Sequence, residues 1–228
     1  MTRSERTPPR ASRFVELSHP IEPGMITYPG LPGPVITAHL SREASRGRYA
    51  KDTTFEIGRV EMVANTGTYV DAPLHRFAGG ADVAGLPLER LADLPGVVID
   101  VSASGRAIGP EAFAGRALSG RAVLVRTGWD AHWRTERYGN GHPCLTREAA
   151  EVLAGSGAAL VGIDSLNIDD TQDGERPAHT LLLAAGIPIV EHLCNLAALP
   201  SEGFRVSAVP PPFVGMSSFP VRVWAVCS

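Results

Sequence analysis

Residues 65–75 read N-T-G-T-Y-V-D-A-P-L-H, and this polar, alternating stretch is the most informative part of the chain. Side chains of an extended segment point alternately to its two faces, which places Asn65, Tyr69, Asp71 and His75 on one side. Gly67 on that side would let a ligand approach the backbone, and a proline near the end argues against a helix. The pattern predicts a strand edge that lines a cleft. The plain alternative is a half-exposed strand whose polar residues face water.

A second stretch, residues 176–191, reads R-P-A-H-T-L-L-L-A-A-G-I-P-I-V-E. Pro177 can open a helix that puts His179 in its first turn, and the apolar residues before Glu191 predict a strand that ends at this carboxylate. About two helical turns carry the chain roughly 9–10 Å, and about four strand residues return it by roughly 13 Å. We therefore expect His179 and Glu191 at the same end of the layer. A helix-capping histidine and an ordinary strand-end glutamate are the alternative.

The rest of the chain predicts an α/β fold with a β-rich mixed sheet. Short runs rich in valine and isoleucine, flanked by Gly, Pro or Asp, predict strands. These runs are Gly58–Ala64, Gly96–Val101, Ala122–Arg126, Ala158–Ile163, Ile187–Val190, Arg205–Val209 and Val221–Val226. Thr146 is a suitable N-cap for a helix over Arg147–Ala154, and the second helix runs from Pro177 to Leu183. We expect a single domain over residues 13–228, preceded by a flexible tail over residues 1–12.

Composition and charge exclude several classes of protein. The 228 residues include 44% hydrophobic residues and carry a formal net charge of −3, which gives no electrostatic basis for binding nucleic acid or a membrane. No apolar run is long enough to span a membrane, and residues 1–12 lack the apolar core of a signal peptide. We therefore expect a cytoplasmic protein. The three cysteines form no C-x-x-C pair and predict neither a disulfide framework nor a cysteine zinc site.

The two polar stretches resemble the cyclase and kynurenine formamidase-like family, whose signature at residues 65–75 reads H-x-G-T-x-x-D-x-P-x-H. Further similarity runs from about residue 13 onward and includes Leu17–Ile21, Tyr28–Gly30, Arg126–Trp129, Gly162–Asp164 and Pro177–Pro200. The resemblance implies an α/β fold of the swivelling β/β/α type, a small-molecule substrate, and a homo-oligomer (a dimer or a tetramer) whose neighbouring subunits shape the site. Tyr28 and Trp129, in these matching segments, are candidate substrate-binding residues.

The resemblance also implies roles for individual residues. In the metal-dependent branch, two signature histidines and the aspartate hold one divalent metal, and the aspartate holds a second metal together with a downstream His and Glu. Asp71, His179 and Glu191 match the second set of ligands. His75 matches the proposed acid/base group.

The first set of ligands is broken in this chain. Asn65 and Tyr69 stand where the metal-dependent branch has histidines. An amide carbonyl is a weak zinc ligand, and a phenol with an ordinary pKa near 10 is a poor ligand at neutral pH. We expect either no metal or one divalent metal, Zn²⁺ or Mn²⁺, and no organic cofactor.

Three functions remain open at this point. In the first, a cyclase-family enzyme closes a ring by an aldol-type reaction of secondary metabolism, such as that of aromatic polyketides. His75 removes a proton next to a carbonyl, and Tyr69 or Asn65 donates a hydrogen bond to the developing enolate. The second is a metal-dependent amidohydrolase similar to kynurenine formamidase or isatin hydrolase, which would cleave a C–N, ester or lactone bond. The third is a non-catalytic relative that binds a small ligand.

Overall fold

The computed structural model describes residues 12–227, so the tail predicted for residues 1–12 lies outside the described residues except for its last member. The fold is α/β, with one nine-stranded mixed sheet in the order β1-β13-β11-β5-β7-β9-β10-β4-β12. Its strands are β1 (Arg13–Glu16), β4 (Tyr69–Asp71), β5 (Leu94–Asp100), β7 (Ala122–Arg126), β9 (Leu160–Ile163), β10 (Ile189–Glu191), β11 (Glu202–Ala208), β12 (Ser218–Pro220) and β13 (Val223–Cys227). A separate two-stranded sheet pairs β6 (Ala107–Ile108) with β8 (Cys144–Leu145).

The middle of the large sheet is parallel. Strands β5, β7, β9 and β10 lie side by side and run in the same direction. All four residues of β9 are buried, as expected for a strand covered on both faces. Antiparallel strands complete both edges, with β11, β13 and β1 on one side and β4 and β12 on the other. The site described below forms where β10 meets β4.

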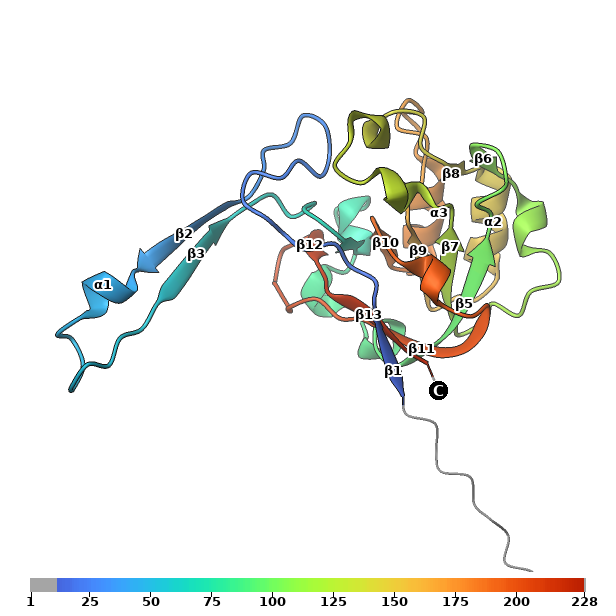
Figure 1. Cartoon of the computed structure of the whole chain (residues 1–228). Coiled ribbons are helices and arrows are strands. Elements are labelled where there is room, and N and C mark those ends of the chain that lie inside the picture. Colours follow the sequence, from blue (N-terminus) through green and yellow to red (C-terminus); the bar gives the residue numbers. More distant parts are fainter. Residues whose placement is uncertain (1–11, 228) are drawn as a thin grey trace, which may run out of the picture.

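Helices α2 (Arg147–Gly155) and α3 (Pro177–Ala184) pack together beside the parallel strands (Figure 1). Their buried side chains, such as Leu153 and Leu182, share one hydrophobic core with residues of β5, β7 and β9. A second core contains residues of β1, β11 and β13, such as Phe204 and Val223. Because α3 rests on one of these cores, its first turn is fixed against the sheet and can hold a functional side chain rigidly.

The helices follow the sequence prediction closely. Thr146 caps α2 by accepting a hydrogen bond from the Ala149 N–H, and α3 begins at Pro177. The predicted strands are present with ends shifted by up to three residues, whereas β1, β2, β6, β8 and β12 were not predicted. β12 reads S-F-P and contains the proline that ordinarily argues against a strand, but it is the edge strand of the sheet, where proline is tolerated. No helix among residues 12–227 is long and apolar enough to cross a membrane.

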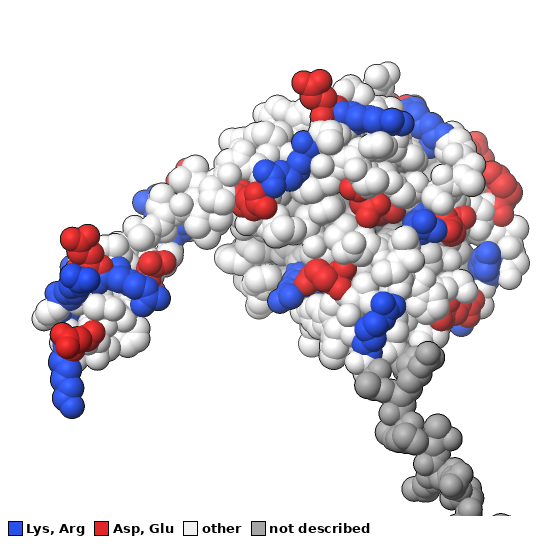
Figure 2. Space-filling model, in the orientation of Figure 1, with Lys and Arg blue, Asp and Glu red and all other residues white. Residues whose placement is uncertain are grey.

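A hairpin projects from the body of the molecule (Figure 1). It consists of β2 (Val35–Leu40) and β3 (Ile57–Glu61), which pair antiparallel, and the short helix α1 (Arg42–Ser45) between them. Every residue of β3 is exposed, and so is every residue of β2 but the last. Charged side chains gather toward the tip of the projection (Figure 2). The exposed residues also include large apolar side chains, namely Val35, Ile36, Tyr49, Phe55, Ile57 and Val60.

Candidate active site

The stretch over residues 65–75 folds as a short strand followed by a turn. Only Tyr69–Asp71 forms a strand, β4, which pairs with β10 and β12. Pro73–His75 forms a single turn of 3-10 helix. Tyr69 and Asp71 share a face of β4 because they are two residues apart, whereas His75 reaches that side through the helical turn. The predicted polar residues therefore meet, although the segment is not extended throughout.

Gly67 does not open onto a ligand, contrary to the prediction. Its φ is +67°, in the left-handed region that favours glycine. A Cβ added to Gly67 would lie 3.1 Å from Cγ1 of Ile21, and its N–H donates to Oγ1 of Thr27 at 2.7 Å. Glycine is needed here because the chain turns tightly against Ile21.

Asp71 lies at the base of the site and is completely buried. Its Oδ2 is 3.6 Å from Nε2 of His179, and its Oδ1 is 3.7 Å from Nδ1 of His75. Ser218 of β12 donates its hydroxyl proton to Oδ1 of Asp71. Burial alone would raise the pKa of Asp71, but the close approach of His179 and His75 and the hydrogen bond from Ser218 hold that pKa below its usual value. The site thus contains a buried, ionised carboxylate.

Ser218 also fixes the tautomer of His75. The two residues approach to 3.0 Å between Oγ and Nδ1. Because the hydroxyl proton points to Asp71, the Ser218 oxygen accepts a hydrogen bond from the Nδ1–H of His75. In the neutral form of this tautomer Nε2 is the acceptor nitrogen, and it makes no hydrogen bond to the residues between 12 and 227. An exposed imidazole with a free Nε2 is suited to act as a general base.

Asp169 orients His179 in the first turn of α3. Nδ1 of His179 donates to Oδ2 of Asp169 at 2.6 Å, and the backbone N–H groups of Ala178 and His179 donate to the same carboxylate. Nε2 of His179 therefore points at Asp71 and at Glu191, whose Oε1 is 3.7 Å from it. Burial alone would lower the pKa of His179, but the hydrogen bond to Asp169 and the nearby charges of Glu191 and Asp71 raise it to about 10.

Glu191 ends β10 at the same end of the sheet as His179, as the sequence predicted. Its carboxylate accepts hydrogen bonds from the Tyr69 hydroxyl at 2.6 Å and from the Ile168 N–H at 2.7 Å. Burial raises the pKa of Glu191 to about 7, even though the charge of His179 opposes this. Burial and the charge of Glu191 also raise the pKa of Tyr69 well above its ordinary value. Tyr69 is consequently a neutral hydrogen-bond donor.

Nε2 of His179 lies at metal-ligand spacing from two carboxylates. Ligand atoms about 2.1 Å from a tetrahedral ion lie about 3.4 Å apart, close to the 3.6 Å and 3.7 Å from Nε2 of His179 to Asp71 and Glu191. Oδ2 of Asp71 is buried without a hydrogen-bond partner among residues 12–227, which is costly unless another charge compensates. Ligand atoms of Asp71, His75 and His179 also lie within 4.8 Å of one another. Asp71, His75 and His179 therefore fit a divalent cation, and Glu191 is a further carboxylate beside His179.

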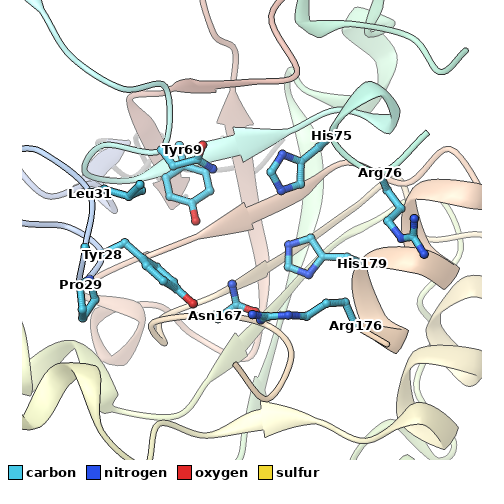
Figure 3. Close-up of a pocket in the computed structure, with 11 residues that line it drawn as sticks. Tyr28, Pro29, Leu31, Tyr69, His75, Arg76, Asn167, Arg176 and His179 are labelled. Atoms are coloured by element: carbon cyan, nitrogen blue, oxygen red, sulfur yellow. The ribbon is translucent and has the colours of Figure 1, made fainter. Parts of the chain in front are cut away.

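A pocket of about 480 Å³ opens over these residues (Figure 3). Its lining consists of Tyr28, Pro29, Gly30, Leu31, Asn65, Tyr69, His75, Arg76, Asn167, Arg176 and His179. Tyr28 thus lies where a substrate-binding residue would be placed. Trp129 does not line this pocket, contrary to the prediction, because its indole N–H donates to the Tyr138 carbonyl at 3.0 Å and its ring packs against His132.

Sequence reasoning missed Ser218, Asp169, Asn167 and Arg176. Ser218 is 147 positions from Asp71 along the chain, so no local pattern connects them. Asp169 and Asn167 follow β9 in a polar run, S-L-N-I-D-D, after a buried strand. That run is a signal of the kind used for Glu191, and it could have identified both residues.

Two further histidines have buried Nε2 atoms: His192 is completely buried beside the site, and His19 is partly buried. The ring of His192 lies 5.2 Å from that of Tyr69, and its Nδ1 is 2.9 Å from the Tyr138 hydroxyl. The Nε2 atoms of His192 and His19 are buried without a hydrogen-bond partner in the described part of the chain. Burial lowers the pKa of His192 to about 3 and that of His19 to about 4. Both rings are therefore neutral at pH 7.

Protonation of His192 should make the fold sensitive to acid. Because the folded pKa of about 3 is below the ordinary value of 6.5, the unfolded chain binds more protons between these pH values, and stability falls as the pH is lowered through them. The loss attributable to His192 between pH 7 and pH 5 is about 2 kcal/mol. Urea unfolding of the wild type and of His192→Asn, a residue that tolerates the φ of +57°, measures it. An equal loss in both proteins would contradict the assignment.

The fold and the site define a small-molecule enzyme with a carboxylate–histidine centre, and comparison with known proteins identifies the family. The sequence profile described as "Putative cyclase" matches residues 15–170, more than half of the chain. The chain therefore belongs to the cyclase family and is an enzyme of that family.

Named relatives and solved structures agree with this assignment. The chain is 29% identical over 214 residues to kynurenine formamidase of Bacillus cytotoxicus, covering 93% of this chain and 97% of the relative. It is 27% identical to kynurenine formamidase of Salinibacter ruber, with coverages of 92% and 95%. The structure of isatin hydrolase A from Labrenzia aggregata bound to benzyl benzoate matches with a TM-score of 0.80 at 26% identity, over 95% of this chain and 94% of the other. A structure described as a potential metal-dependent hydrolase with cyclase activity matches with a TM-score of 0.79 at 27% identity, over 96% and 99%.

Proposed function

We propose that this enzyme hydrolyses a C–N or ester bond at a carbonyl of a small aromatic molecule, such as an aryl formamide, a lactam or a lactone. The observation that carries the proposal is the buried Oδ2 of Asp71, which has no hydrogen-bond partner among residues 12–227 and lies 3.6 Å from Nε2 of His179. His179 in turn lines a pocket that Tyr28 and Tyr69 also line. The relatives named as kynurenine formamidase and isatin hydrolase support the same class of reaction.

Asp71 and His179 would hold a divalent cation, with Glu191 as the third ligand. A bound divalent cation supplies Lewis acidity at the carbonyl oxygen of the substrate. His75, held by Ser218 with Nε2 free, removes the proton of the attacking water and returns it to the leaving group. Tyr69 keeps its proton and holds Glu191 in place at 2.6 Å. Asp169 keeps the His179 ring in the orientation that presents Nε2.

A second candidate function is ring closure without a metal. Two observations favour it: Asn65 and Tyr69 replace the histidines of the metal-dependent branch, and both line the pocket with His75. In that reaction His75 removes a proton next to a carbonyl, and Asn65 donates a hydrogen bond to the enolate oxygen, because the Tyr69 hydroxyl is already bonded to Glu191.

Metal analysis combined with a substrate panel separates the two functions. Protein purified without added metal is analysed for metal and titrated with Zn²⁺ and Mn²⁺, and it is assayed on N-formylkynurenine, isatin and aryl esters with and without chelator. About one equivalent of metal and chelator-sensitive hydrolysis are expected. Chelator-insensitive hydrolysis by metal-free protein would contradict the proposed role of the cation but would still support a hydrolase function. If no member of the panel were hydrolysed at any metal content, the search would move to cyclisation substrates.

We also propose that the protein is a homo-oligomer that covers the hairpin of β2 and β3. An isolated two-stranded hairpin is marginally stable in water, and large apolar patches on a soluble protein mark interaction sites. Val35 and Val60 are 54% and 55% exposed, so a neighbouring subunit packed on this hairpin would bury apolar area that is now in contact with water.

Charged residues on the hairpin should dissociate this oligomer. Ile36→Asp and Val60→Asp each place a carboxylate on an apolar residue of the projection, where burial against a neighbour would leave it unpaired and costly. Light scattering coupled to gel filtration is expected to show a dimer or tetramer for the wild type and a monomer for the double variant. Arg59→Asp, at the neighbouring charged position whose side chain points to the other face of β3, serves as the control. A monomeric wild type would contradict the proposal.

A further inference from the structure

The pocket contains two arginines without an acidic partner. Eight of the 17 arginines between residues 12 and 227 pair with an aspartate or glutamate, and most of the others are away from the pocket. Arg176 and Arg76 form no such pair in that range, yet both line the pocket. Positive charge that the fold leaves uncompensated in a pocket is available to a ligand of opposite charge.

Neutral groups hold Arg176 in place. Its guanidinium donates to Oδ1 of Asn167 at 3.2 Å and to the Thr171 carbonyl at 3.1 Å. Asn167 is anchored in turn, because its Nδ2 donates to Oε2 of Glu191 at 3.3 Å. These contacts fix the direction of the side chain without neutralising its charge. A guanidinium has five N–H donors, so most of them remain for a ligand.

The position of Arg176 suits recognition of one end of a substrate. Its side chain extends from the start of α3 along the pocket toward Asn167 and Tyr28, whereas Arg76 lies beyond His179 (Figure 3). The N-terminus of α3 is not itself an anion site, because the N–H groups of Ala178 and His179 are bonded to Asp169. Only the guanidinium is left to bind an anion at this end of the helix.

We propose that Arg176 binds a carboxylate carried by the aromatic substrate. This inference rests on the proposed function and specifies the substrate class: an aryl formamide, lactam or ester bearing a negative charge. The aromatic ring packs against Tyr28 and Leu31, and the reacting carbonyl faces His75. A planar fork of N–H donors matches a carboxylate geometrically. Arg76 is exposed and bonded only through Nε to Thr180 at 3.1 Å, so it contributes a weaker attraction that salt screens.

Binding of a matched pair of probes tests the proposal without requiring turnover. The fluorescent acid 2-aminobenzoate and its neutral counterpart 2-aminobenzamide are titrated into the protein as purified. The wild type is expected to bind the acid more tightly. Arg176→Gln, which can keep the contact with Asn167, should weaken binding of the acid by about tenfold to a hundredfold and change binding of the amide by less than about twofold. Arg176→Lys should fall between the wild type and Arg176→Gln, because it keeps the charge but loses the fork.

Further variants and conditions make the outcome decisive. Arg76→Gln should weaken binding of the acid a few-fold, and high salt should remove that difference. Arg116→Gln, at an exposed position outside the pocket, should change nothing. Equal wild-type affinity for both probes, no saturable binding of the acid, or an equal loss of both probes in Arg176→Gln would each overturn the proposal. The proposal would also be overturned if chelator abolished binding of the acid and Arg176→Gln did not, because the carboxylate would then be bound to a cation. Hydrolysis that fails while the probes still discriminate would count against the proposed function alone.

Discussion

Asp71→Asn is expected to remove cation binding and to lower kcat/KM by about a thousandfold or more, equivalent to at least about 4 kcal/mol of transition-state stabilisation. The substitution keeps the shape of the side chain and replaces the oxygen that faces His179 without a hydrogen-bond partner. An amide carries no charge, so it neither attracts a divalent cation strongly nor balances a charged His179. Metal analysis after dialysis and steady-state kinetics on the best substrate of the panel measure both effects.

The pH dependence of cation binding provides an independent check on Asp71. Surrounding carboxylates raise the pKa of His179 to about 10, and a cation at Nε2 must displace that proton. Cation affinity should therefore increase as the pH rises from about 6 to about 9. Asp52→Asn, which removes an exposed carboxylate near the hairpin, is the matched control and should leave affinity and kinetics unchanged. Full metal content in Asp71→Asn would place the cation elsewhere.

The parts of the fold that the sequence predicted are those with a local cause. Thr146 caps its helix through its own side chain, and Pro177 opens the next helix because its missing N–H is not needed there. The buried parallel strands appear as continuous apolar runs. By contrast, β2 carries apolar residues that stay exposed in the single chain, so their pattern gives no indication of the face they pack on.

The candidate site was partly predictable for the same reason. Asp71 and His75 are close in sequence, and the helix–strand geometry between His179 and Glu191 could be estimated from their separation along the chain. Ser218 and Arg176 acquire their roles only when the sheet brings β12 beside β4 and when Asn167 is bonded to Glu191. These contacts depend on the topology of the sheet, which spacing along the chain does not encode.

The backbone conformation of Arg176 could not be predicted from the sequence either. Its φ is +49° directly before a proline, a conformation that non-glycine residues rarely adopt and that tends to occur at functional sites. Sequence rules place an ordinary extended residue before proline. The structure instead turns this residue so that its side chain crosses the pocket rather than leaving it.

His75→Ala is expected to lower kcat by about a hundredfold to ten-thousandfold, the usual contribution of a positioned general base, and to leave the metal content unchanged. The side chain is exposed at the pocket, so its removal leaves little cavity and should not unfold the protein. Its Nε2 is free because Ser218 holds Nδ1 at 3.0 Å. Steady-state kinetics, metal analysis and thermal unfolding of the same preparation measure the three quantities.

Ser218→Ala distinguishes a positioned base from a metal ligand at His75. Without the hydroxyl, His75 loses the acceptor that selects its tautomer, and Asp71 loses a donor. The expected result is a drop in kcat of about tenfold, with the acidic limb of the pH–rate profile displaced and KM nearly unchanged. Added imidazole should restore part of the activity of His75→Ala, because it can enter the space left by the ring and accept the same proton, but it should not improve Ser218→Ala. Loss of the cation in His75→Ala would contradict this role and would make His75 a metal ligand in place of Glu191. The ligand atoms of Asp71, His75 and His179 lie within 4.8 Å of one another, which permits that set. Proton transfer would then have to be assigned to another residue.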